Sequence, residues 1–222
     1  MRIALLGGTG DIGEGLALRW AHDTDHDVII GSRDPEKARA KAEEYAAELD
    51  SRGSETKLTG FANEMAADRA EIVVLAVPPY HVADTVEAVA DKLDEGDILI
   101  SPATGMKRDD SGFHYHRPGA GSVTQLAVDA APEAVPVVGA FHNLAAGRLA
   151  NLDADLGIDT LVVADDDAAK STVSTLAEEI EGLRALDAGS IANAAEVESV
   201  TPLLINVTMN NSGLHDLGIR FD

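Results

Sequence analysis

Residues 1–33 read MRIALLGGTGDIGEGLALRWAHDTDHDVIIGSR, and this stretch decides the fold. Its apolar run at residues 3–6 is short enough for a strand that is buried on both faces of a parallel sheet. A cluster of glycines follows, then a helix expected from about Asp11 and a second strand expected over residues 27–31. A strand, a glycine turn, a helix and a second strand in this order are typical of a dinucleotide-binding unit.

The glycines fit two spacings, Gly8-x-Gly10-x-x-Gly13 and Gly7-x-x-Gly10-x-x-Gly13, which have the same chemical consequence. Such a turn lets the backbone approach a pyrophosphate, and the free N–H groups at the start of the next helix bind that anion. A glycine triplet by itself also fits an ordinary tight turn, because glycine occurs wherever φ must be positive. The flanking strand and helix favour the dinucleotide site.

The tip of the second expected strand carries Ser32 and Arg33, where an NAD-binding protein usually has an acid for the ribose 2′-hydroxyl. Arg33 can bind a 2′-phosphate with its planar guanidinium, and Lys37 adds a charge one helical turn further on. We interpret Asp34 as a helix N-cap, because Pro35 suits the first helical position. An ordinary solvated helix start is the alternative for the basic residues. The pattern predicts NADP as the cofactor.

The composition limits the size of the fold and the class of partner. The chain has 222 residues, enough for a dinucleotide domain and a small appended unit. It carries 17 Lys and Arg against 39 Asp and Glu, a formal charge of −22, which argues against nucleic acid or an anionic membrane as a partner. The acids are spread along the chain, as in proteins of salt-accumulating halophiles, although an ordinary acidic surface is the alternative.

Two further observations concern the cellular compartment. The sequence has no cysteine, which excludes disulfides, thiolate catalysis and cysteine metal sites. No apolar run approaches the length of a membrane span, and Met1 leads almost directly into the first strand. We therefore expect a cytoplasmic protein with no signal peptide and no membrane contact.

Strands and helices alternate to about residue 100, which predicts an α/β fold: a doubly wound parallel sheet of the Rossmann type. After the second strand we expect a helix over residues 35–49, a strand over 57–59, a helix over 63–70 capped by Asn63, a strand over 72–77, a helix over 81–93 and a strand over 97–100. Residues 101–121 are rich in Gly and Pro, and a connection of this length usually covers a site.

We place a domain boundary after residue 133. Residues 1–133 are the expected NADP-binding Rossmann domain, and residues 134–222 are an expected small α+β C-terminal unit that packs directly on it. The elements expected from residue 122 onward are a helix over 122–131, strands over 135–140 and 160–164, a helix over 166–180, a strand over 184–187 and a helical region over 191–210.

Seven segments are informative, and the last five lie outside the generic Rossmann fingerprint and are therefore more specific than the glycines. They are MRIALLGGTGDIGEGLALR (1–19), VIIGSRDPEKA (28–38), Val77-Pro78, GAFHNLAAGRLANLD (139–153), GLRALDAG (182–189), VESVTPLLINV (197–207) and GLHDLGIRF (213–221). With these segments the chain resembles the F420H2:NADP oxidoreductases, the NADPH-dependent coenzyme F420 reductase family, over nearly its whole length. The departures are Pro79-Tyr80, in place of an aromatic and an acid, and residues 143–145, in place of a Thr-Ile-Pro-like run. Both departures concern the deazaflavin pocket.

The resemblance implies an oxidoreductase that transfers a hydride between NADP(H) and the 5-deazaflavin coenzyme F420. The two cofactors carry this chemistry themselves, so we name no catalytic residue. The resemblance implies that the pyrophosphate is held by Thr9, Gly10, Asp11 and Ile12, with Gly8 and Gly13 beside them, the 2′-phosphate by Ser32, Arg33 and Lys37, and the nicotinamide end by Val77, Pro78, His81, Thr104, Ala146 and Leu217, while His142 and Leu144 complete the cofactor-binding set. Plain core packing is the alternative for the apolar members.

Three histidines are candidates for a catalytic or metal-binding role. His142 follows an expected strand in a shared segment, and we interpret it as a hydrogen-bonding or subunit-contact residue, because the hydride transfer needs no general acid. His114 and His116 lie two residues apart in the connection over residues 101–121. No carboxylate at ligand spacing accompanies them, so we expect no metal site.

Other functions remain open at this stage. A short-chain alcohol dehydrogenase is excluded, because its Tyr-x-x-x-Lys motif is absent: the residues four positions after Tyr45, Tyr80 and Tyr115 are Leu49, Asp84 and Gly119. The alternatives are an NADP-dependent imine or hydroxyacid reductase of related Rossmann type, which normally has a longer helical domain, and a non-catalytic NADP-sensing module. The apolar final helix, with Leu203, Leu204, Ile205 and Val207, predicts a homodimer.

The charge of −22 leads to a prediction about salt. Stability should rise with KCl concentration, because added ions screen the repulsion among the carboxylates. The melting temperature is measured from low to molar KCl. A flat profile would contradict the halophile interpretation.

Overall fold

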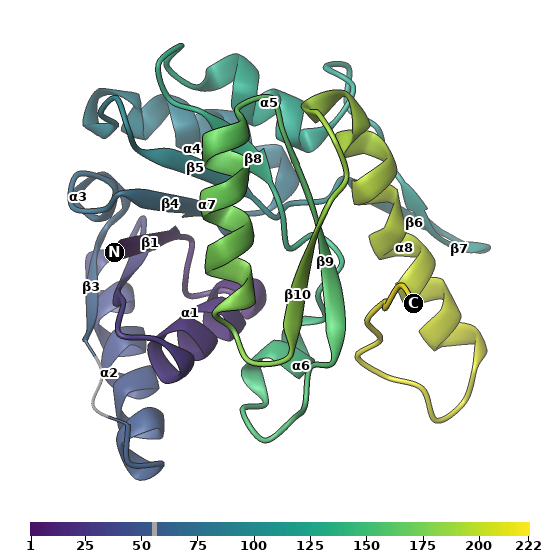
Figure 1. Cartoon of the computed structure of the whole chain (residues 1–222), viewed down its shortest axis with the longest axis horizontal. Helices are drawn as coiled ribbons and strands as arrows, with labels where there is room; N and C mark the ends of the chain where they lie inside the picture. Colours follow the sequence, from purple (N-terminus) through teal and green to yellow (C-terminus); the bar gives the residue numbers. More distant parts are fainter. Residues whose placement is uncertain (55–56) are drawn as a thin grey trace.

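Helices and strands alternate along the described residues, 1–54 and 57–222, of this computed structural model (Figure 1). The order is β1 (Arg2–Leu6), α1 (Asp11–Asp23), β2 (Asp27–Ser32), α2 (Pro35–Ser51), β3 (Leu58–Ala62), α3 (Asn63–Ala67), β4 (Ile72–Leu75), η1 (Pro79–His81), α4 (Val82–Val89), η2 (Ala90–Lys92), β5 (Ile98–Ser101), β6 (Met106–Asp109), β7 (Gly112–Tyr115), α5 (Val123–Ala130), β8 (Val137–Gly139), α6 (Ala146–Ala150), β9 (Ile158–Ala164), α7 (Asp167–Glu178), β10 (Leu183–Asp187), η3 (Ile191–Asn193) and α8 (Ala194–Asn210).

Eight of the described strands form one sheet in the order β10-β9-β8-β5-β4-β1-β2-β3. Neighbouring strands are parallel, except that β8 and β9 run antiparallel. The strand order reverses at β1, which pairs with β2 on one side and β4 on the other. The predicted Rossmann-type α/β fold is confirmed, and the crevice at such a reversal is where ligands bind in this fold.

Both faces of the sheet are covered, as the apolar strands predicted. Ile3 and Leu5 of β1 face a core shared with α1, α2 and α7, whereas Ala4 and Leu6 face a second core shared with α3, α4 and α5. All four side chains are fully buried. The alternation of these side chains along β1 therefore places helices on both faces of the sheet.

Several expected boundaries were wrong in detail. Asn63 does not cap α3: β3 runs directly into the helix, Ala62 takes the cap position, and Asn63 is the first helical residue. The helix expected over residues 81–93 is a short α-helix between two 3₁₀ turns. Residues 101–121, expected to be irregular, contain the antiparallel hairpin of β6 and β7. The hairpin packs on α8, because the side-chain amide of Asn206 bonds both backbone groups of Phe113.

The sheet continues across the boundary expected after residue 133. β8 pairs with β5, and β9 and β10 extend the same sheet on that side. The residues beyond 133 thus pack directly on the first part of the chain, as expected. Whether they fold as a separate unit stays a prediction.

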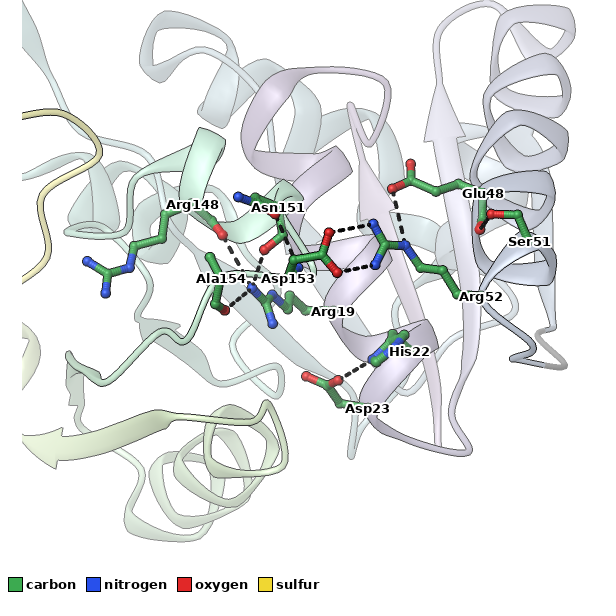
Figure 2. Close-up of polar contacts among 10 residues, drawn as sticks. All are labelled: Arg19, His22, Asp23, Glu48, Ser51, Arg52, Arg148, Asn151, Asp153 and Ala154. Atoms are coloured by element: carbon green, nitrogen blue, oxygen red, sulfur yellow. Dashed lines mark hydrogen bonds and ion pairs between the residues drawn. The ribbon is translucent and has the colours of Figure 1, made fainter.

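A buried arginine joins α1 to α6. The Arg19 guanidinium donates to four backbone carbonyls. One is that of Leu149 at 2.9 Å. The others are those of Arg148 at 3.3 Å, Asn151 at 2.7 Å and Ala154 at 3.0 Å (Figure 2). Arg19 is 3% exposed, and this burial lowers its pKa. Its donors satisfy carbonyl groups at and beyond the end of α6 that the helix itself leaves free.

Two neighbouring contacts reinforce this junction. Gly15 of α1 lies so close to α6 that an added Cβ would stand 2.5 Å from the Cβ of Leu149. On the outer side, Arg52, the C-cap residue of α2, pairs with Asp153, at 2.7 Å between Nη1 and Oδ1 (Figure 2). The loop after α6 is thereby held from two helices.

The C-terminal tail is fixed on β9 by one buried carboxylate. Asp159 is 1% exposed and accepts two hydrogen bonds at 2.8 Å from Arg184 and one at 2.7 Å from the backbone N–H of Phe221. The backbone N–H of Asp159 also donates to the carbonyl of Ile219 at 2.8 Å. The pKa of Asp159 is lowered, mainly by its hydrogen bonds with Arg184.

The Arg19 junction gives a stability prediction. The substitution Arg19→Met keeps most of the side-chain volume but leaves several buried carbonyls without donors, so it should cost about 2–4 kcal/mol of unfolding free energy. Arg52→Met is the matched control, because it removes an exposed ion pair to the same loop and should change little. Urea unfolding measures both variants. Equal losses would contradict the assigned role of Arg19.

Candidate functional site

A cleft of about 520 Å³ opens where β1, β2, β3 and β4 end. Its walls come from the glycine turn, the tip of β2, the start of α3, the end of β4 and one side of α4. The lining residues are Gly7, Thr9, Gly10, Ser32, Arg33, Lys37, Asn63, Glu64, Ala76, Val77, Pro78, His81, Asp84, Thr85, Ala88 and Val89. The cleft thus brings together eight of the predicted cofactor-binding residues: Thr9, Gly10, Ser32, Arg33, Lys37, Val77, Pro78 and His81.

The glycine turn is shaped for close backbone approach. An added Cβ on Gly13 would lie 2.6 Å from the Cα of Gly8, so only glycine lets the helix start pack on the turn. Gly10 is the N-cap of α1 and offers no side-chain hydrogen bond. The first N–H groups of α1 therefore have no side-chain acceptor, which suits an anion. Sequence analysis missed Tyr45, whose hydroxyl lies 3.3 Å from the carbonyl oxygen of Gly8 and supports the turn.

The remaining residues predicted near the turn do not line the cleft. Asp11 is exposed to solvent, and Ile12 is half-buried against the first core. The backbone N–H of Gly8 donates to the carbonyls of Leu5 and Gly31, so it holds the turn against the ends of β1 and β2. Gly8 and Gly13 thus shape the turn.

The tip of β2 presents its basic residues to the cleft. Asp34 caps α2 as predicted, accepting from the N–H groups of Glu36 at 3.0 Å and Lys37 at 3.4 Å. Ion pairs on α2 engage Arg39 and Lys41, and among the described residues none engages Arg33 or Lys37. Two cationic side chains with no carboxylate partner in the described chain are suited to a doubly charged phosphate.

A second, mainly apolar cavity of about 390 Å³ lies between α8, the segment before and at the start of α6, and the C-terminal tail. It is lined by Asn143, Leu144, Ala145, Ala146, Gly147, Thr201, Leu204, Ile205, Thr208, Met209, Asp216 and Leu217. It brings together three further predicted residues, Leu144, Ala146 and Leu217. The tail approaches closely, because a Cβ on Gly147 would lie 2.8 Å from Oδ1 of Asp216.

His142 and Thr104 line neither cavity, in contrast to their expected contact with a cofactor. His142 is 3% exposed, and burial lowers its pKa to about 3, so the imidazole is neutral. Thr201 joins the two residues, since its hydroxyl donates to the carbonyl of His142 at 2.7 Å and lies 3.3 Å from the hydroxyl of Thr104. Both residues sit behind the wall of the second cavity.

A buried carboxylate orders this region. Glu198 of α8 accepts from the N–H groups of Val123 at 3.1 Å and Thr124 at 2.9 Å, and thus caps α5. It also accepts from the hydroxyl of Tyr115 at 2.9 Å, and burial raises its pKa. The Thr124 hydroxyl donates to Glu198 at 3.0 Å and lies 3.3 Å from Nε2 of His142. Since the Thr124 proton goes to the carboxylate, Nε2 of His142 is the protonated nitrogen.

Sequence analysis missed the far wall of the cleft. This wall is formed by the start of α3, the residue after β4 and one side of α4. The residues that line it are Asn63, Glu64, Ala76, Asp84, Thr85, Ala88 and Val89. The general rule that ligands bind at the carboxyl ends of parallel strands would have pointed to Asn63 and Ala76, which directly follow β3 and β4.

Two other findings concern metals and membranes. Within residues 1–54 and 57–222, no group of three His, Asp or Glu side chains is arranged to hold a metal ion. No helix in the same parts of the chain is both long enough and apolar enough to cross a bilayer.

Comparison with known proteins gives the family. Residues 2–105 match the family model described as NADP oxidoreductase coenzyme F420-dependent. A protein named F420-dependent NADP reductase from Methanocaldococcus jannaschii is 36% identical over 94% of this chain and 93% of its own. A protein of the same name from Methanothermobacter marburgensis is 37% identical over 99% of this chain and 97% of its own.

Solved structures agree on the fold. An Arthrobacter protein assigned as an F420-dependent NADP-reductase superposes with a TM-score of 0.78 at 24% identity, covering 99% of this chain and 98% of its own. A pyrroline-5-carboxylate reductase from Coxiella burnetii gives a TM-score of 0.61 at 18% identity, covering 94% of this chain and 67% of its own. With curated relatives above 30% identity over nearly its full length, the chain belongs to the F420-dependent NADP reductase family.

Proposed function

We propose that this protein transfers a hydride between NADP(H) and coenzyme F420. The main observation in support is that one helix, α1, borders the cleft at its start and contacts α6, whose first residues line the second cavity. Gly10 at the start of α1 borders the cleft, and Gly15, five residues later, touches α6, where an added Cβ would lie 3.3 Å from the carbonyl oxygen of Ala146. Five residues of helix span roughly 7–8 Å. Two ligands held on this helix can therefore bring their reactive ends together.

The cleft fits NADP. The uncapped start of α1 takes the pyrophosphate, and Ser32, Arg33 and Lys37 take the 2′-phosphate. Val77, Pro78 and His81 then border the nicotinamide end. The apolar second cavity takes the deazaflavin ring of F420 against Leu144, Ala146 and Leu217.

The protein positions the two cofactor rings and excludes water from the space between them. When bound, the two cofactors supply the chemistry, because nicotinamide and deazaflavin exchange a hydride directly. His142 is buried and neutral, and the transfer does not require it to donate a proton. Arg19 and Asp159 hold the walls of the second cavity in place, through α6 and the tail respectively. Fixed walls favour stacking of the rings and exclude water.

We also infer a cytoplasmic homodimer adapted to a salty cytoplasm. Leu203 and Val207 on α8 are 59% and 36% exposed, and an apolar face of this kind suits a second copy of the chain. Leu204 and Ile205, expected on that face, line the second cavity instead. The charge of −22 supports the adaptation to salt.

The proposed activity is tested by mixing the protein with NADPH and oxidised F420 and following the absorbance of both. Equal molar losses of NADPH and of oxidised F420 are expected. An imine or hydroxyacid reductase would leave F420 unchanged and oxidise NADPH only with an imine or keto acid. An NADP-sensing module would bind NADPH and change neither absorbance. Either of these outcomes would overturn the proposal.

Arg33 decides the choice of dinucleotide. Arg33→Ala should weaken NADPH binding by about 1.5–3 kcal/mol, the range for a charge-assisted contact, with little effect on NADH. Titration calorimetry with both cofactors checks this, and Arg39→Ala, which is on α2 outside the cleft, is the control. Equal weakening of both cofactors would mean that Arg33 has only a structural role.

The C-terminal tail closes the deazaflavin cavity. Deletion from Leu214 onward removes Asp216 and Leu217 from its wall and should abolish F420 reduction. NADPH binding should persist, because no residue of the tail lines the cleft. The point variant Leu217→Ala, which keeps the Asp159 contacts, should raise the KM for F420 with NADPH unchanged. A folded deletion variant with normal turnover would contradict the role of the tail.

A further inference from the structure

Asn63 carries an unsatisfied polar group on the wall of the cleft. Its side-chain Oδ1 is buried without a hydrogen-bond partner, and the residue is 9% exposed. Among the described residues no hydrogen bond from its amide nitrogen is found either, and Asn63 lines the cleft together with Ser32 and Arg33. A buried amide oxygen without a donor is unfavourable in the free protein, which indicates a donor that arrives with a ligand.

The register of the sheet places Asn63 beside the phosphate-binding residues. β3 pairs with β2 so that Gly31 faces Phe61 and Ser32 faces Ala62. Asn63 is the next residue, and its Oδ1 would lie 2.9 Å from a Cβ added to Gly31. The missing side chain of Gly31 thus makes room for the amide at the end of β2. Rotation about the last side-chain bond of Asn costs little, so either amide atom can turn toward the cleft.

We propose that Asn63 binds the free 3′-hydroxyl of the adenosine ribose of NADP. This inference rests on the proposed dinucleotide site. Asn63 lines the same cleft as the glycine turn, which faces the pyrophosphate, and as Arg33 and Lys37, which face the 2′-phosphate. A neutral amide both donates and accepts, which matches a hydroxyl, whereas the phosphate is served by the two cations. Asn63 therefore recognises the part of the ligand that NADP and NAD share.

Binding of NADPH and NADH to Asn63→Ala tests this assignment. The affinity for both should fall by the same factor, about threefold to tenfold for one lost hydrogen bond. This differs from the NADPH-selective loss expected for Arg33→Ala. The melting temperature of the ligand-free variant should be unchanged or higher, because an unsatisfied buried group has been removed. A purely structural asparagine would lower it.

Two further variants complete the experiment. Asn63→Leu keeps the branched shape without polar atoms and should show the same loss of both cofactors, which guards against a packing defect in the alanine variant. Met65→Ala, on the same helix but outside the cleft and 45% exposed, is the control and should bind as the original protein does. Unchanged affinity in both Asn63 variants, or a loss confined to NADPH, overturns the ribose contact. Failure of the unmodified protein to bind either dinucleotide overturns the proposed function instead.

Discussion

The buried guanidinium of Arg19 is the contact on which the arrangement of the two cavities depends. Four carbonyl oxygens from residues 148–154 converge on it, and no carboxylate hydrogen-bonds it in the described chain. The glycine turn at one end of α1 shapes the first cavity, while Arg19 and Gly15 further along the helix fix α6 and the second cavity. One helix thus sets the separation of the two cavities. This is the geometry that a reaction between two bound rings requires.

The rest of the molecule serves that geometry. The reversal of strand order at β1 opens the cleft, and the segment between the antiparallel strands β8 and β9 carries α6, which packs on α1. Glu198 and Asp159 are buried carboxylates with full sets of donors, and they fix α5 and the C-terminal tail. The proposed reaction needs no reactive side chain between the two cavities, since the cofactors supply the chemistry.

Local sequence signals predicted one wall of the first cavity, but they predicted neither its far wall nor the second cavity. The glycine spacing, Ser32-Arg33 and the cap at Asp34 are local signals, so they could be interpreted without tertiary structure. Arg19 looked like an ordinary helix residue, because its partners lie about 130 positions away along the chain. Asn63 was mistaken for a cap, because the direct passage from β3 into α3 depends on pairing with β2. The contacts of Leu144 and Leu217 came only from family resemblance, since apolar residues of a core and of a pocket have the same pattern.

The most direct test of this account follows the transferred hydrogen itself. NADPH that carries deuterium at both C4 positions is incubated with the protein and oxidised F420 in ordinary water, and the reduced F420 is analysed by NMR. Direct transfer between two rings in a water-excluding junction predicts one deuterium at C5 of the deazaflavin. Reduced F420 without deuterium at C5 would contradict the account.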